Sequence, residues 1–207
     1  MNRHVDEIAA RLSLRQPQRR SLEILAEITD RLPLDKGMDL TTALEAARDA
    51  FPDFSGFDSR DFPSFCFALA TGVGKTRLMG AFVAYLHRVH GVRNFLILAP
   101  GLTVYEKLIT DFTPGTAKYV LKGIHEFAVL PPMLVTGEIL KGLLRAEIPS
   151  FRYGSIFSTS TNSRARVCRI FAKSLAKAIS RYCRGSAISC CSWMSRIVTG
   201  QSSAPAL

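Results

Sequence analysis

Acidic residues are absent from the last part of this chain. The sequence has 207 residues and 17 Asp and Glu, and the last of these acids is Glu147. Residues 1–150 carry 18 Lys and Arg and are nearly neutral, whereas residues 151–207 carry nine Lys and Arg and no acid. The net charge of +10 therefore belongs to the tail, and it does not indicate that the whole chain binds nucleic acid.

Long apolar runs and paired cysteines are lacking as well. No apolar stretch approaches the roughly 20 residues that span a bilayer. The N-terminus already contains Asp6 and Glu7 and leads into no apolar core, which argues against a signal peptide. We therefore expect a cytoplasmic protein with no membrane partner. The five cysteines show no C-x-x-C spacing, so free thiols in a reducing compartment are expected instead of a zinc site.

Hydrophobic periodicity predicts an N-terminal helical segment followed by an α/β unit. Helices are expected over 5–32, with Pro17 in the first turn of a second helix, and over 40–50. Buried strands are expected over 64–69 and 94–99, and a third, short strand over 133–136.

Two further helices are expected between these strands. One runs over 75–90 and ends at Gly91, and the other runs over 103–112 with Thr103 as its cap. This order of elements predicts a parallel sheet with right-handed crossovers. We divide the chain into a helical segment (1–60), an α/β domain (61–150) and a basic tail (151–207).

A glycine-rich loop lies between the first predicted strand and its helix. It reads Gly72-Val73-Gly74-Lys75-Thr76. Glycines let successive backbone N–H groups point at a phosphate, and the helix N-terminus adds partial positive charge. The lysine would reach the β- and γ-phosphates, and the threonine hydroxyl would bind Mg²⁺. Leu69 stands where the strict pattern has glycine, and a plain glycine turn with a surface lysine is the alternative.

Three motifs together carry a family resemblance over roughly residues 12–140. Ala70-Thr71-Gly72-Val73-Gly74-Lys75-Thr76 resembles motif I of superfamily-two helicases. Leu98-Ala99-Pro100 with the segment that begins at Leu102-Thr103 resembles motif Ia, and Leu14-Arg15-Gln16-Pro17-Gln18 resembles the upstream Gln motif. With Pro131-Pro132 and Val135-Thr136-Gly137, the chain is most similar to the Res subunit of type III restriction enzymes.

The resemblance implies a fold and an ATP site. The fold would be an incomplete P-loop (RecA-like) parallel sheet of the α/β class, with an N-terminal helical segment and an irregular basic tail. ATP and Mg²⁺ would be the cofactors. Gln18 would read adenine, and Thr76 would bind the metal through Mg-ATP. The nucleotide-binding residues would be Gln18, Thr71, Gly72, Val73, Gly74, Lys75 and Thr76.

The resemblance also implies partners. Pro100 and Thr103 would contact double-stranded DNA, and a modification (methyltransferase) subunit would be the protein partner. The activity of the family is ATP-dependent DNA translocation coupled to endonuclease cleavage. From the residues alone, Gln18 could instead be a solvated residue at a helix start, and Thr103 could be a helix cap that touches no DNA.

The carboxylate motif Asp-Glu-x-His of the family is missing. No Asp follows Asp111, and no acid follows Glu147. The second motor lobe and the nuclease domain would need a longer chain, so we expect a truncated chain that binds ATP without turnover. The neighbouring reading frame of Trp193 to Gly200 can encode Asp-Glu-Ser-His-Arg-Tyr-Arg, and we therefore interpret the tail as a frameshift near residues 145–155.

Two other interpretations remain open at this point. In the first, the chain is a basic nucleic-acid-binding protein that acts through its C-terminal tail. In the second, it is another phosphate-loop enzyme, such as a small kinase. The kinase would need a carboxylate near the end of the second strand, where Pro100-Gly101 stands instead.

Overall fold

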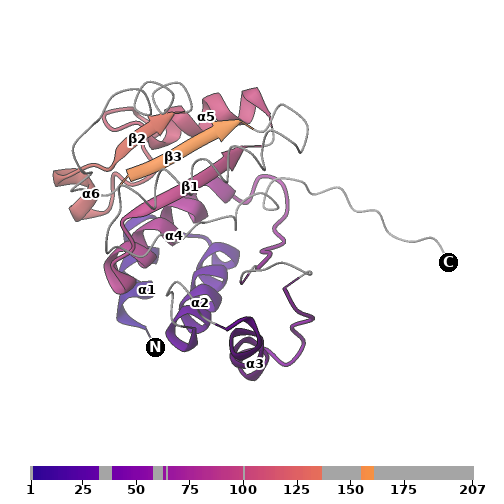
Figure 1. The fold of residues 1–207 in the computed structure, drawn as a ribbon. Helices are drawn as coiled ribbons and strands as arrows, with labels where there is room; N and C mark the ends of the chain where they lie inside the picture. The colour runs from indigo at the N-terminus through magenta and orange to yellow at the C-terminus, as the bar shows by residue number, and fades with distance from the viewer. Residues whose placement is uncertain are drawn as a thin grey trace, which may run out of the picture.

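A three-stranded parallel sheet forms one layer of the structure (Figure 1). The computed structural model describes residues 2–32, 39–57, 63, 65–99, 101–136 and 155–160. The strands are β1 (Asn94–Ala99), β2 (Met133–Thr136) and β3 (Ser155–Ser160). β3 lies in the middle and runs parallel to both neighbours, with Ser155 opposite Asn94 of β1 and opposite Met133 of β2.

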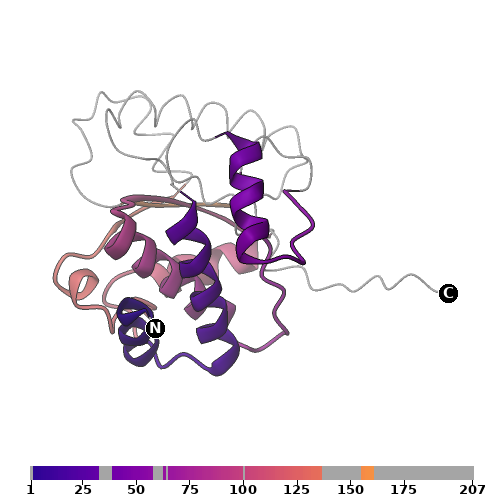
Figure 2. The same cartoon turned by 90° about the horizontal axis from the view of Figure 1, so that it is seen from below.

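Helices cover one face of this sheet. They are α1 (Arg3–Arg11), α2 (Gln16–Arg31), α4 (Lys75–His90) and α5 (Leu102–Phe112), and Figure 2 shows all four on the same side. α3 (Leu40–Ala50) packs against α2, and α6 (His125–Val129) precedes β2. None of the described helices is both long enough and apolar enough to cross a membrane.

The core is built around α4. Every residue from Leu78 to Leu86 is buried, so this helix is covered on all sides, as its nearly continuous apolar sequence requires. α1 and α2 pack on it from the N-terminal segment. The hydroxyl of Tyr85 accepts a hydrogen bond from Asn2 (2.9 Å) and donates one to Asp30 (3.3 Å). The N-terminal helices therefore belong to the same packed unit as the helix that follows the glycine-rich loop.

Arg88 joins three helices at the far end of α4. Its guanidinium forms a two-pronged ion pair with Glu126 of α6, with both N–O distances at 2.8 Å, and a second pair with Glu7 of α1 at 3.1 Å. Hydrogen bonding to Arg88 lowers the pKa of Glu126 below its ordinary value. A planar guanidinium can bind two carboxylates at once, and these ion pairs hold α1 and α6 against α4.

Most predicted elements are confirmed. The helix over 75–90 ends at Gly91, whose φ of +64° lies in the left-handed region, and β1 and β2 have the predicted bounds. The cap of α5 was predicted wrongly. Gly101 occupies the N-cap without a side-chain hydrogen bond, and Thr103 lies inside the first turn.

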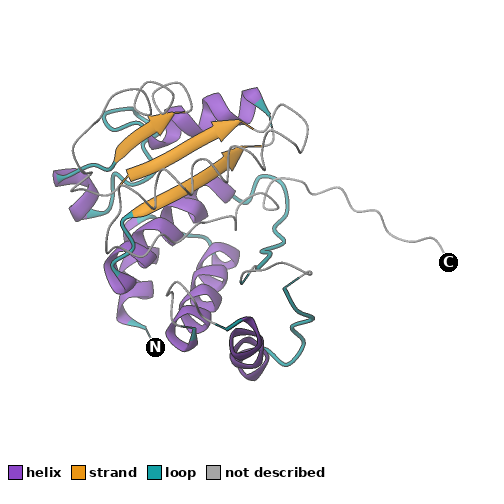
Figure 3. Cartoon of the chain, viewed as in Figure 1, coloured by secondary structure: helices purple, strands orange, loops and turns teal. Residues whose placement is uncertain are grey.

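The strand predicted over 64–69 is wrong for the described residues 65–69, which form an extended loop drawn in teal (Figure 3). Burial alternates along it, because Phe67 is buried whereas Cys66 and Ala68 are exposed. Phe67 stacks edge-on against Phe82 of α4, with ring centroids 5.0 Å apart. Phe67 thus gains its burial from packing on α4, and not from a strand covered on both faces.

The expectation of an irregular tail is wrong for residues 155–160, which form β3. Ile156, Phe157 and Thr159 are β-branched or aromatic residues, which favour strands whatever the net charge of the surrounding segment. The other tail residues lie outside the described part of the chain. The division at residue 150 thus falls between two strands of one sheet.

Candidate functional site

The glycine loop enters α4 through two left-handed backbone positions. Gly72 has φ +82° and Gly74 has φ +91°, values that other residues adopt only with strain. The Gly74 carbonyl accepts from the N–H groups of Arg77 (3.0 Å) and Leu78 (3.2 Å) and so begins the helix. The first N–H groups of α4 have no partners within the helix, which makes this end suited to an anion.

The Lys75 side chain turns back over this loop. Its ammonium donates a hydrogen bond to the Ala70 carbonyl at 3.2 Å, in an exposed setting. The bond is made to a backbone group of the loop itself, and the ammonium is held above the turn that Gly72 and Gly74 create. A phosphate bound in the turn would lie within reach of this charge.

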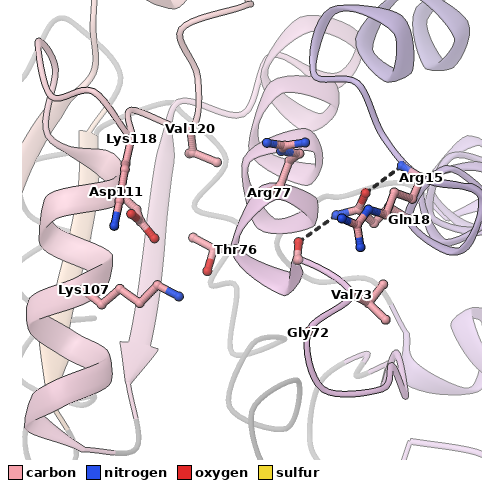
Figure 4. Close-up of a pocket in the computed structure, with 11 residues that line it drawn as sticks. Arg15, Gln18, Gly72, Val73, Thr76, Arg77, Lys107, Asp111, Lys118 and Val120 are labelled. Carbon is pink, nitrogen blue, oxygen red and sulfur yellow. Dashed lines mark hydrogen bonds between the residues drawn. The ribbon is translucent and has the colours of Figure 1, made fainter.

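Gln18 ties α2 to the loop. Its side chain is 1% exposed, so the alternative of a solvated residue is wrong. The Gln18 Oε1 accepts from the Arg15 N–H at 2.7 Å, and Nε2 donates to the Gly74 carbonyl at 2.8 Å (Figure 4). One amide group thus caps the start of α2 and holds the loop in place at Gly74.

A cavity of about 270 Å³ opens beside the loop. One wall comes from the loop, the start of α4 and α2, and the opposite wall comes from α5 and the segment 118–120 (Figure 4). The residues that line it are Arg15, Gln18, Gly72, Val73, Gly74, Thr76, Arg77, Lys107, Asp111, Lys118 and Val120.

The cavity is strongly positive. Four cationic side chains line it, namely Arg15, Arg77, Lys107 and Lys118, against the single carboxylate of Asp111. The cations are exposed at the rim, whereas Asp111 is only 6% exposed. Such a surplus favours a polyanion, and the partial positive charge of the α4 N-terminus adds to it.

The structure brings most of the predicted nucleotide residues together. Gln18, Gly72, Val73, Gly74 and Thr76 line the cavity, and Thr71 and Lys75 belong to the same loop without lining it. Thr103 is exposed in the first turn of α5, and Pro100 lies outside the described residues. Within the described part of the chain, no group of three or more His, Cys, Asp or Glu could hold a metal by itself.

Sequence reasoning missed the second wall of the cavity, which is formed by Lys107, Asp111 and Lys118. One available signal was spacing, because Thr103, Lys107 and Asp111 are each four residues apart and lie along one stripe of α5. Nothing in the sequence brings this stripe opposite Thr76. That placement comes from the packing of α5 beside β1 and β3.

The donor set is compatible with Mg²⁺. This ion prefers oxygen ligands and is usually held by one or two carboxylates together with substrate phosphates and waters. Thr76, which carries a hydroxyl, and Asp111, which carries a carboxylate, line the cavity from opposite walls (Figure 4). The residues present are therefore compatible with a magnesium ion whose remaining ligands come from a bound triphosphate and water.

Replacing Gln18 with glutamate is expected to destabilise the fold by about 1–3 kcal/mol, because a carboxylate oxygen cannot donate to the Gly74 carbonyl and would be buried facing it. Denaturant unfolding measures this loss. The matched control is Gln16→Glu, since Gln16 is exposed in the first turn of the same helix and an acid there is neutral or favourable. Equal stability of the two variants would contradict the role of Gln18 in holding the loop.

Comparison with known proteins adds a family to this geometry. Residues 11–165 match the family model described as "Type III restriction enzyme, res subunit". The match covers the loop, the cavity and all three strands, and it continues past the predicted division at residue 150. No curated protein and no solved structure matches the chain.

Proposed function

Because the chain belongs to the family of type III restriction enzyme Res subunits, we propose that its cavity binds ATP with Mg²⁺ as the nucleotide site of a helicase-like motor lobe. The main observation in support of this proposal is the loop at the start of α4. Two glycines with left-handed backbone conformation lie there, beside a cavity that is lined by Thr76 and four cationic side chains. In this proposal Thr71, Gly72, Val73 and Gly74 present backbone N–H groups to phosphate.

Side chains from the loop and from α2 would make further contacts with the nucleotide. Lys75 would leave the Ala70 carbonyl for the β- and γ-phosphates, because an ammonium gains more from a phosphate oxygen than from a neutral carbonyl. Gln18 would contact adenine with the N–H and the lone pair that its two internal bonds leave over. Bound Mg²⁺, held by the Thr76 hydroxyl, would neutralise part of the charge of the triphosphate.

DNA contact and further assembly belong to the same proposal. Thr103 is exposed at the start of α5 and would contact the phosphate backbone of double-stranded DNA. Pro100, which lies outside the described residues, would contact the same DNA. A modification subunit would supply sequence recognition, and the RecA-like sheet would belong to the ATP-binding half of the motor. We propose that the chain binds ATP without turnover, because the family's carboxylate motif is missing from its sequence.

Equilibrium titration of a fluorescent ATP analogue tests the function. We expect saturable binding in the presence of Mg²⁺, with competition by ATP and pyrophosphate and much weaker competition by adenosine, because the cavity selects for anionic charge. No release of inorganic phosphate should accompany binding. Absence of saturable binding, or adenosine competing as well as ATP, would refute the proposal.

A further inference from the structure

Asp111 is a buried charge for which the described residues provide no partner. It is 6% exposed, and no described side chain donates a hydrogen bond to its carboxylate or forms an ion pair with it. Leaving a buried charged group unpaired costs more free energy than leaving a buried neutral group unpaired. A group of this kind calls for an explanation by a ligand, an ion or a bound water.

The surroundings of this carboxylate indicate which kind of ligand it could bind. Lys107 is one helical turn away on α5 and Lys118 lines the same wall, yet neither lies within ion-pair distance of it. The carboxylate instead points into the cavity, and Thr76 lies on the opposite wall (Figure 4). An anionic ligand alone would be repelled by Asp111, whereas a divalent cation carried by that ligand would be attracted to it.

We propose that Asp111 is a magnesium-holding carboxylate of the nucleotide site, acting with Thr76 on the ion that accompanies the triphosphate. The inference rests on the proposed function. The carboxylate that would hold the ion comes from α5, the helix that follows β1. Asp111 would bind the ion directly or through a water, and Lys107 and Lys118 would remain available to the phosphates. Its role would be to position the ion, with no part in activating water.

The coupling between Mg²⁺ and ATP tests this role in the full chain. The experiment compares the ATP affinity in the presence of Mg²⁺ with the ATP affinity in the presence of a chelator. It uses the unmodified chain, Asp111→Asn and the control Glu106→Gln, which removes an exposed carboxylate from the same helix. The Asp111 variant should lose about 10–100-fold of the enhancement by Mg²⁺. Its affinity for ATP without metal should be equal or higher, because one negative charge has left the cavity.

The outcomes separate the inference from the function on which it rests. If the unmodified chain shows no saturable ATP binding, the proposed function fails first. If it binds ATP and Asp111→Asn keeps the full enhancement by Mg²⁺, only the inference is overturned. A purely structural role for Asp111 would lower both affinities together and leave their ratio unchanged, which also counts against it.

A measurement on the unmodified chain covers the case in which the variant does not fold. Fe²⁺ replaces Mg²⁺ in the ATP complex, and ascorbate with peroxide then generates radicals that cut the backbone near the metal. We expect ATP-dependent cleavage both in the loop at 72–76 and near residue 111. Cleavage confined to the loop would overturn the proposal.

Discussion

Replacing Lys75 with alanine is expected to weaken ATP binding about 100-fold, which corresponds to about 2.7 kcal/mol. The ammonium makes one exposed hydrogen bond, to the Ala70 carbonyl, so its removal should cost the fold little. Its loss from a site that binds a triphosphate removes charge-assisted hydrogen bonds, which are about twice as strong as neutral ones. Fluorescence anisotropy with a labelled ATP measures the affinity, and thermal unfolding checks that the variant is folded.

Lys122→Ala is the matched control for this prediction. Lys122 is an exposed lysine that does not line the cavity, so the variant loses the same formal charge from another place. Its ATP affinity should stay within about twofold of the unmodified chain, because exposed charges at a distance are screened by salt. Equal affinities for both variants would show that the loop does not hold the nucleotide.

Replacing Gly74 with alanine should be the more damaging of two chemically identical changes in the loop. Gly72 and Gly74 both have positive φ, so alanine costs about 1–2 kcal/mol of backbone strain at either position. A Cβ at Gly72 would meet nothing within 4 Å, whereas a Cβ at Gly74 would lie 2.7 Å from Gln18 Nε2. Gly74→Ala should therefore cost about 1–3 kcal/mol more than Gly72→Ala in the free energy of unfolding.

A double variant identifies the source of that difference. In Gly74→Ala with Gln18→Ala the clash is gone, so the two single costs should sum to more than the cost of the pair. Denaturant unfolding of the four proteins and the unmodified chain gives the comparison. If Gly72→Ala and Gly74→Ala prove equally destabilising, Gln18 does not constrain the loop in the way the structure shows.

Local patterns in the sequence predicted local structure well. The helix over 75–90 has an uninterrupted apolar core and a glycine at its end, and its bounds agree with α4. The run of apolar residues over 94–99 likewise agrees with β1. The described residues 65–69 do not form the predicted strand, because an apolar, aromatic run requires only burial, and Phe67 is buried by stacking on Phe82.

The parts of the site that the sequence did not predict depend on distant contacts. Gln18 was identified by its motif, but its bond to Gly74 spans 56 positions, so its burial could not be inferred locally. Asp111 was not a predicted site residue, and only the packing of α5 brings it opposite Thr76. These placements depend on the tertiary fold, which composition and residue spacing do not predict directly.

The central place of β3 has a consequence for how the protein is made. In the described part of the sheet, β1 and β2 meet only through β3, which is the last of the three to leave the ribosome. Until about residue 160 has been synthesised, both earlier strands present open edges that invite association with other chains. A shortened version stopping at residue 150 would keep that vulnerable state permanently, although its charge is nearly balanced.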